Sequence, residues 1–184
     1  MSAITMRKLR TIEMHRLSVE QFRQADKLPL VVVLDNVRSL YNVGSIFRTC
    51  DAFRVEALYL CGITATPPHP EVHKTALGAE DSVAWQHFDN TEDAVALLKQ
   101  KGYHVFAVEQ AEGAANLLET SVVNSDVPAA VILGNEVKGV QQQVIDQCDG
   151  CIEIPQYGTK HSMNVAITAG IMIWEFAKPY ISKL

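Results

Sequence analysis

The hydrophobic positions of the chain form short continuous runs that alternate with segments of helical, amphipathic spacing. The clearest run, PLVVVLDN at 29–36, is rich in β-branched residues and predicts a strand buried on both faces of a parallel sheet. By the same criteria, strands are expected at 55–62, 82–88, 103–110, 128–134 and 151–155. Helices are expected at 41–53, 91–102, 140–147 and 164–178. This alternation predicts an α/β fold, with a mostly parallel sheet and helices on both of its faces.

One long connection lies between these elements. Residues 64–80, TATPPHPEVHKTALGAE, contain three prolines and are expected to form a long loop. Long loops in compact domains are often functional. We find no internal repeat, low-complexity tract or linker, so residues 29–184 are expected to form a single domain.

The first 28 residues differ in charge from the rest of the chain. The sequence carries a net charge of −5, but residues 1–28 contain six basic and three acidic residues, which gives them +3 and leaves −8 for the remainder. Ser18 and Gln21 have capping-box spacing, so this basic arm is expected to be helical. Its Arg7, Lys8 and Arg10 are candidates for contacts with phosphate, although a solvated helix face explains the same pattern.

Composition argues against several other classes of protein. The first residues lack a signal-peptide pattern, and no run approaches the roughly 20 apolar residues that span a bilayer, so a soluble cytoplasmic protein is expected. Cys148 and Cys151 form one C-x-x-C pair. A zinc ribbon needs a second such pair, and a thioredoxin-like pair opens a helix after a strand, whereas this pair precedes an expected strand. We therefore expect neither a metal site nor a redox site.

An arginine in the helix expected at 41–53 does not fit its surroundings. The apolar stripe of this helix consists of Val43, Ile46, Phe47 and Cys50. Arg48 projects from the opposite side, with Gly44 four residues before it and Ala52 four residues after it. An ion pair between Arg48 and Asp51, worth only about 0.2 to 0.5 kcal/mol, is one explanation. The other is that these small neighbours leave room for a ligand against the guanidinium group.

The common fingerprints of nucleotide and hydrolase sites are absent from the sequence. No G-x-G-x-x-G follows a strand, and neither H-E-x-x-H nor G-x-S-x-G occurs. The segment GNEVKGVQ at 134–141 has the two glycines of a phosphate loop, but Val140 and Gln141 stand where lysine and a hydroxyl residue are required. These absences argue against a Rossmann dinucleotide site, a P-loop, a zinc protease and a simple serine hydrolase.

Three junctions rich in small and amide residues remain as candidate sites. They are LDNVRSLYNVGSIFRT at 34–49, VILGNEVKGV at 131–140 and IEIPQYGTKHSMNVAITAG at 152–170. Ligands of open α/β sheets bind beyond the carboxyl ends of the strands. Gly134 would let a ligand approach the backbone there, and Glu136 projects a carboxylate just beyond it. Each junction alone is also explained by local turn chemistry.

Together and in this order, the three segments resemble the three motifs of the SpoU family of RNA ribose 2'-O-methyltransferases, in the SPOUT superfamily. The resemblance extends over about residues 30–178. It implies an α/β domain whose C-terminal segment forms a deep trefoil knot, one of the rare exceptions to unknotted topology. It also implies S-adenosylmethionine as the cofactor, tRNA or rRNA as the substrate, and a homodimer built around the knot.

The resemblance assigns roles to individual residues. The catalytic residues that it implies are Asn42, Arg48, Glu136, Ser162 and Asn164. The cofactor-binding residues that it implies are Val108, Gly134, Ile154, Ser162 and Met163. Met163 stands where leucine is frequent in the family, which is an exchange of similar volume.

Arg48 is the residue whose role the chemistry constrains most. A guanidinium group remains protonated in proteins, so we expect Arg48 to bind a substrate phosphate and to stabilise the developing oxyanion instead of acting as the base. With Arg7, Lys8 and Arg10 of the arm, Lys74 and Lys160 are further candidates for contacts with RNA.

Two other functions are compatible with parts of this pattern. A catalytically silent module of the same fold would bind RNA or cofactor without turnover, but such a protein would be expected to have lost one of the five catalytic residues. A flavodoxin-like flavin or nucleotide protein would share the layer architecture, and no motif in the sequence supports it independently.

Overall fold

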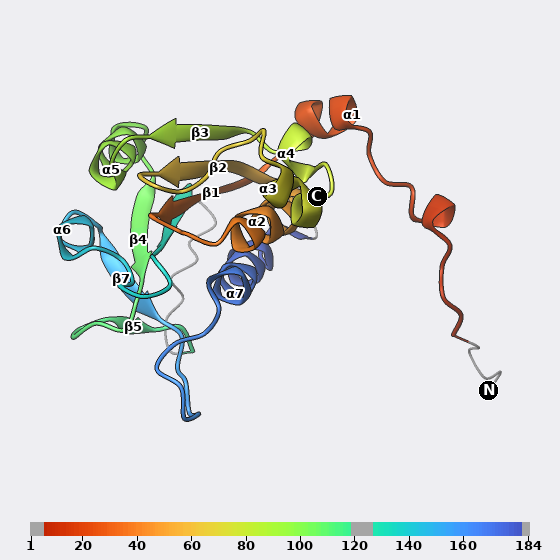
Figure 1. The fold of residues 1–184 in the computed structure, drawn as a ribbon. Helices are drawn as coiled ribbons and strands as arrows, with labels where there is room; N and C mark the ends of the chain where they lie inside the picture. The colour runs from red at the N-terminus through yellow and green to blue at the C-terminus, as the bar shows by residue number, and fades with distance from the viewer. Residues whose placement is uncertain (1–5, 119–126, 182–184) are drawn as a thin grey trace.

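The computed structural model describes residues 6–118 and 127–181, and it has the α/β architecture that the sequence predicts (Figure 1). The described residues form one seven-stranded sheet in the order β3-β2-β1-β6-β4-β7-β5, and every ladder between these strands is parallel. The strands are β1 Leu28–Asp35, β2 Val55–Cys61, β3 Trp85–Phe88, β4 His104–Val108, β5 Ala115–Asn116, β6 Ala129–Leu133 and β7 Gly150–Glu153. The two-residue strand β5 is not among the predicted elements.

Helices cover both faces of the sheet, as expected. The helices are α1 Val19–Gln24, α2 Leu40–Ala52, α3 Pro70–Ala76, α4 Ala79–Ser82, α5 Thr91–Gln100, α6 Gln142–Ile145 and α7 Val165–Ala177. Alternate residues of β1 point to opposite faces: Leu30 and Val32 pack with α2 and α7, whereas Val31 and Val33 pack with α5 and α6. The central strand is therefore buried on both sides, which explains its continuous run of β-branched residues.

The expectation of a long loop at 64–80 is wrong, because this segment contains α3 and α4. Pro70 occupies the first turn of α3, where its missing N–H costs nothing, and His69 caps the helix by accepting a hydrogen bond from the Glu71 N–H. Val72 and Ala76 are buried against α2. Prolines that read as loop formers in the sequence thus initiate a helix.

The N-terminal arm is helical only in short pieces. A 3₁₀ helix spans Thr11–Met14, α1 follows at Val19–Gln24, and the capping box expected from Ser18 and Gln21 is present. Phe22 of α1 is buried in the core, whereas the segment before α1 reaches away from the sheet (Figure 1). None of the helices in residues 6–118 and 127–181 has the length and apolar character needed to cross a membrane.

Candidate functional site

A pocket of about 560 Å³ lies at the carboxyl ends of β4, β6 and β7. It is lined by residues 108–112 after β4, by residues 133–140 after β6, and beyond β7 by Ile154, Gln156 and residues 161–163. This volume is in the range of sites for cofactors and small molecules. Its position agrees with the rule that open α/β sheets bind ligands beyond the ends of their strands.

The structure places all five residues of the expected cofactor site on this pocket. They are Val108, Gly134, Ile154, Ser162 and Met163. They come from the ends of three neighbouring strands, which the register brings together: Val108 lies opposite both Leu133 of β6 and Ile152 of β7. Residues 54 positions apart in the chain, Val108 and Ser162, therefore border one cavity.

The structure explains the glycine at position 134 by a contact within the protein, whereas a close approach of a ligand was expected from the sequence. A Cβ atom at this position would lie 2.1 Å from the carbonyl carbon of Gly139 and 2.1 Å from the nitrogen of Val140. The close approach is thus made by the loop's own backbone, which forms a bridge between Asn135 and Gly139. The Asn135 side chain stiffens the same turn by accepting from the N–H groups of Val137 and Lys138.

Glu136 is held against the first turn of α2. Its carboxylate accepts hydrogen bonds from the N–H groups of Arg38 and Ser39, both at 3.0 Å, and from the side-chain nitrogen of Asn42 at 3.1 Å. The N-terminus of a helix leaves backbone N–H groups unpaired and favours negative charge. Glu136 therefore joins the segment after β6 to the helix that carries Arg48.

These contacts change the acidity of Glu136. Partial burial by itself raises the pKa of the carboxyl group. The hydrogen bonds from the Arg38 N–H, from its own N–H, from the Ser39 N–H and from Asn42 together outweigh that effect, so the pKa lies below its ordinary value of 4.5. The structure thus favours the ionised form of Glu136.

Asn42 extends this network to the third segment. Its Oδ1 accepts a hydrogen bond of 3.1 Å from the side-chain nitrogen of Asn164. Asn164 also caps α7, because its Oδ1 accepts from the N–H groups of Ala166 at 2.9 Å and Ile167 at 3.3 Å. Glu136, Asn42 and Asn164, one from each of the three segments, consequently form one hydrogen-bonded chain.

Arg48 lies apart from this chain. It is exposed on α2, does not line the pocket, and makes no side-chain hydrogen bond or ion pair with the residues that the structure describes. The surface pair with Asp51 does not form, and Asp51 accepts a hydrogen bond of 2.6 Å from the Ser82 hydroxyl. The guanidinium group is therefore available to a ligand, although not to one enclosed in the pocket of its own chain.

The interpretation that Gly44 leaves room for a ligand beside Arg48 is wrong. This glycine is buried, and a Cβ atom there would lie 2.2 Å from the Thr75 hydroxyl oxygen and 2.2 Å from the Val72 carbonyl oxygen. Its small size lets α2 and α3 pack closely and leaves no space for a ligand. Ala52 is exposed, as the sequence pattern suggests.

Sequence reasoning missed two acidic residues that organise the site. Asp35, at the end of β1, is fully buried and accepts hydrogen bonds from the Thr91 hydroxyl, from the Asn36 side chain, and from both the N–H and the side chain of Gln141. Glu109, directly after β4, accepts from the Val140 N–H at 3.0 Å. A polar residue at the end of a buried strand was the available signal for both.

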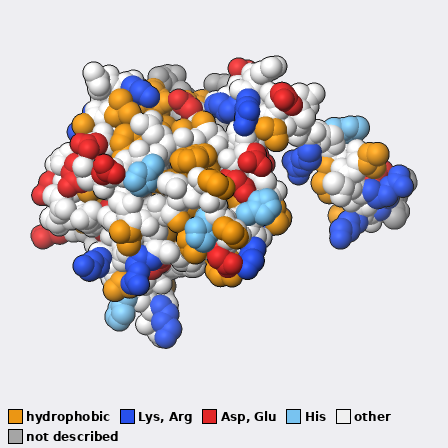
Figure 2. All heavy atoms as spheres, turned by 45° about the horizontal axis from the view of Figure 1, so that its top comes forward, with side chains coloured by type: hydrophobic (Ala, Val, Ile, Leu, Met, Phe, Trp, Pro, Cys, Tyr) orange, Lys and Arg blue, Asp and Glu red, His pale blue; other side chains and the backbone are white. Residues whose placement is uncertain are grey.

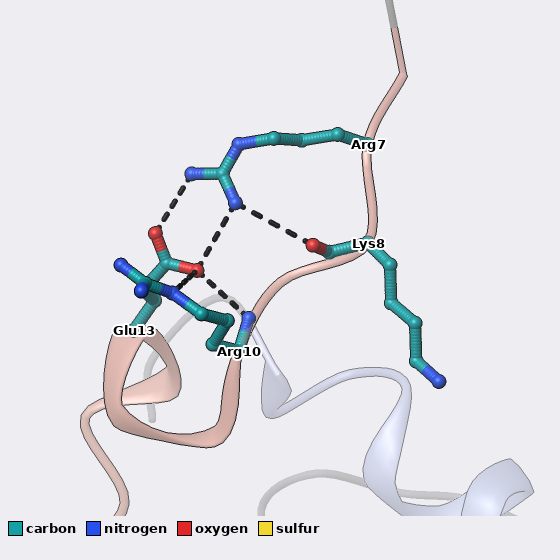
Figure 3. Close-up of polar contacts among 4 residues, drawn as sticks. All are labelled: Arg7, Lys8, Arg10 and Glu13. Carbon is teal, nitrogen blue, oxygen red and sulfur yellow. Dashed lines mark hydrogen bonds and ion pairs between the residues drawn. The ribbon is translucent and has the colours of Figure 1, made fainter.

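The candidate RNA-contacting residues lie in different surroundings. In the arm, Arg7 and Arg10 gather around Glu13 and the Lys8 side chain points away from them (Figure 3). The hydrogen bond from Arg7, followed by that from the Arg10 N–H, lowers the pKa of Glu13 to about 2. Lys74 pairs with Glu71 at 2.6 Å on α3.

Lys160 is exposed on the loop that projects beyond β7, next to the pocket residue His161. Figure 2 shows Lys, Arg and His side chains on this projecting loop and on the arm, and both basic and acidic side chains on the body.

Cys148 and Cys151 do not form a disulfide and pack instead against backbone carbonyl groups of Val144 and Glu109. Burial is the main cause that raises the pKa of the Cys148 thiol to about 12, which disfavours the reactive thiolate. In the described ranges, no three His, Cys, Asp or Glu side chains lie close enough together to hold a metal ion.

Residues 29–174 match the SpoU rRNA methylase family. The tRNA (guanosine(18)-2'-O)-methyltransferase of Thermus thermophilus is 31% identical over 163 residues, which cover 89% of this chain and 81% of that protein. A Staphylococcus haemolyticus protein assigned to the TrmH family of tRNA/rRNA methyltransferases is 32% identical over 160 residues, and this chain spans 63% of its length.

Solved structures show the same fold. The TrmH/SpoU tRNA modifying enzyme of A. aeolicus superposes with a TM-score of 0.77 at 26% identity, over 90% of this chain and 83% of that one. The AdoMet-bound rRNA methyltransferase of Sinorhizobium meliloti gives a TM-score of 0.75 at 28% identity, over 85% of this chain and 61% of that one.

Proposed function

The chain belongs to the SpoU rRNA methylase family, and on this premise we propose that it transfers a methyl group from S-adenosylmethionine to a ribose 2'-hydroxyl of tRNA or rRNA. The observation that carries this proposal is the hydrogen-bonded chain of Glu136, Asn42 and Asn164 beside the pocket. It links the three segments that the family motifs occupy. Of these three residues, Glu136 also lines the pocket, so the chain of hydrogen bonds connects the pocket to the helix that carries Arg48.

The pocket fits the proposed cofactor in size and in the kind of groups that line it. Residues 134–140 line part of a cavity of about 560 Å³, and Ile154 and Met163 would provide apolar walls for an adenine ring. When bound, S-adenosylmethionine supplies an electrophilic methyl group on a positively charged sulfur. The loop of 134–140 is already braced by Asn135 and Glu136, so little ordering is left to occur on binding.

In the mechanism that we propose, Arg48 acts on the RNA. A ribose hydroxyl becomes a nucleophile as its proton leaves, so the site must stabilise developing negative charge on that oxygen. The unpaired guanidinium of Arg48 can bind a phosphate through two N–H groups and face the oxyanion with the same charge. The proton leaves to water or to a neighbouring group. Ser162 and Asn164 would orient the nucleotide at the pocket edge.

A homodimer would explain why Arg48 and the pocket are apart in one chain. The helices α2 and α7 pack together and carry three exposed apolar side chains, namely Tyr41, Ile167 and Trp174. A second copy placed there would bury them and could bring Arg48 of one subunit to the pocket of the other. Light scattering at micromolar concentration should give twice the 20.3 kDa chain mass; a monomeric mass would contradict the dimer.

We further propose the deep trefoil knot of the family. The segment after β7 lies against the segment after β4, where the Gln110 side chain donates a hydrogen bond of 2.7 Å to the His161 carbonyl group. The chain then passes to α7 on the opposite face of the sheet from α6. A crystal structure traced through residues 109–164 would test the crossing, and an unthreaded path would refute it.

For the rest of the molecule, we propose one methyltransferase domain at 29–184 and an RNA-contacting arm at 1–28, in the cytoplasm. The arm carries Arg7, Lys8 and Arg10, and Lys74 and Lys160 lie on the body as further phosphate contacts. Deletion of residues 1–17 should weaken RNA binding and reduce its salt dependence, while cofactor binding stays unchanged.

The decisive experiment is methyl transfer from labelled S-adenosylmethionine to total tRNA and to rRNA, followed by mapping of 2'-O-methyl positions. Wild-type protein should label one RNA class, and Arg48→Ala should not. Cofactor binding without transfer to either RNA would instead support the silent module of the same fold. Absence of both binding and transfer would reject the proposal.

A further inference from the structure

Glu109 occupies the centre of the pocket edge, between the second and third segments. It follows β4 directly, and its N–H donates a hydrogen bond of 3.1 Å to the carbonyl group of Ile152 in β7. On the other side, Val108, the residue before Glu109, pairs with Leu133, the residue before Gly134. Two residues beyond Ile152 lies Ile154, a wall of the pocket.

The carboxylate of Glu109 is fixed in place before any ligand arrives. One oxygen accepts a hydrogen bond of 2.8 Å from the Gln110 N–H, and the other accepts one of 3.0 Å from the Val140 N–H. A Cβ atom on Gly139 would lie only 2.0 Å from the second oxygen, so this glycine makes room for the acid. A group positioned in this way loses little entropy on binding a ligand.

The Glu109 carboxylate can accept further hydrogen bonds and is not paired with a basic side chain among the described residues. A carboxylate offers about four acceptor sites, and the side chain uses two of them in the hydrogen bonds above. No ion pair among the described residues involves Glu109. The other acids of the pocket differ: Glu136 is committed to α2 through three hydrogen bonds, and Glu112 is exposed.

We propose that Glu109 recognises the ribose of the cofactor by accepting hydrogen bonds from its two hydroxyl groups. This inference rests on the proposed cofactor. A vicinal diol presents two O–H donors to one carboxylate, and an acid beyond a strand end is a general way to bind a nucleoside ribose in α/β sheets. With the adenine against Ile154, the ribose lies beside the adjacent strand end, where Glu109 stands.

Calorimetric binding to the full-length protein tests this assignment without measuring turnover. The ligands are S-adenosylmethionine, S-adenosylhomocysteine and the 2'-deoxy and 3'-deoxy analogues of S-adenosylhomocysteine. The variants are Glu109→Gln, which removes the charge, and Glu109→Asp, which keeps the charge with shorter reach. Asp89→Asn, at an exposed carboxylate outside the pocket, is the matched control for loss of one negative charge.

We expect Glu109→Gln to weaken both natural ligands by the same factor, about tenfold or more, because hydrogen bonds to a charged acceptor are lost. At least one deoxy analogue should bind wild type about tenfold more weakly and lose little further affinity in the variant. Glu109→Asp should fall between wild type and Glu109→Gln, and Asp89→Asn should match wild type. Unfolding of each variant without ligand should remain cooperative.

Other outcomes would overturn the inference. An effect on S-adenosylmethionine alone would show that Glu109 attracts the sulfonium charge. Equal losses for the parent and both deoxy compounds would show that it acts only through the loop. Unchanged affinity in Glu109→Gln would remove its role while leaving the proposed function intact. A wild-type protein that binds none of the ligands would reject the proposed function, and this inference with it.

Discussion

The carboxylate of Glu136 lies 3.1 Å from the side-chain nitrogen of Asn42, a residue 94 positions earlier in the chain. Asn42 in turn accepts a hydrogen bond from Asn164, 122 positions later. The loop after β6, the start of α2 and the start of α7 are thus coupled through three side chains. A change in any one of them should affect both the stability of the site and its chemistry.

Replacing Glu136 by glutamine tests this coupling directly. Glutamine keeps the size of the side chain, but its NH₂ group faces a backbone N–H of Arg38 or Ser39 and cannot accept from it. Because Glu136 is exposed, we expect the free energy of unfolding in urea to fall by about 0.5 to 1.5 kcal/mol. The exposed control, Glu112→Gln, should change it by less than about 0.5 kcal/mol. Equal stability of the two variants would show that the contacts contribute nothing.

The same residue predicts how stability depends on pH. Partial burial opposes ionisation of Glu136, but its hydrogen bonds dominate and lower the pKa in the folded state below 4.5. A lowered folded pKa contributes stability that is fully present above the unfolded pKa and is lost as pH falls through the folded pKa. The stability difference between wild type and Glu136→Gln should therefore be constant from pH 7 to about pH 5 and should shrink below about pH 4.5. A difference that stays unchanged down to pH 3 would argue against this origin.

Gly44→Ala should destabilise the protein, because its new methyl group would meet the backbone of α3 at 2.2 Å. We expect a loss of about 1 to 3 kcal/mol in the free energy of unfolding, typical of overpacking. Ala52→Ser, at an exposed position of the same helix, serves as control and should change stability by less than about 0.5 kcal/mol. If Gly44→Ala were as stable as wild type but failed to bind RNA, Gly44 would instead leave room for a ligand beside Arg48.

The fold was predictable from sequence where its signals are local. The run 29–36 identifies β1 because a strand buried on both faces has no polar alternation. The prolines before Glu71 led to the expectation of a loop instead of α3. In the structure, burial of Val72 and Ala76 against α2 outweighs this local preference for a turn. Tertiary packing therefore determined the secondary structure of this segment, against its local sequence pattern.

For the site, the sequence identified residues but not their partners. Glu136, Asn42 and Asn164 were selected by resemblance, whereas their mutual contacts depend on the order of strands in the sheet. Glu109 belongs to no sequence motif, since a glutamate after a strand is common. Its importance becomes visible only in the structure, where it accepts a hydrogen bond from the Val140 N–H. Long-range contacts of this kind have no local signal in a single sequence.

Asp35 should be essential to the integrity of the pocket, although it does not line it. Asp35→Ala would leave the buried Thr91 hydroxyl and the half-buried Gln141 N–H without their acceptor. We expect the free energy of unfolding to fall by more than about 2 kcal/mol, and cofactor affinity to weaken because the loop before Gln141 loses its anchor. The exposed control Asp89→Ala should leave both measurements close to wild type. Unchanged cofactor affinity in a destabilised Asp35→Ala protein would confine the residue to a structural role.

Replacing Arg48 by lysine tests its role in RNA methylation separately from protein stability and cofactor binding. Arg48 is exposed and makes no side-chain hydrogen bond or ion pair with the described residues, so the thermal midpoint should move little and the free energy of unfolding by less than about 0.5 kcal/mol. Lysine keeps the charge but loses the planar, two-pronged donor geometry, so we expect methyl transfer to fall about 100-fold, with cofactor affinity close to wild type. Single-turnover transfer at saturating RNA, together with calorimetric cofactor binding, measures both. Near-full turnover in Arg48→Lys would show that charge alone suffices, and a parallel loss of cofactor affinity would place Arg48 at the cofactor instead of the RNA.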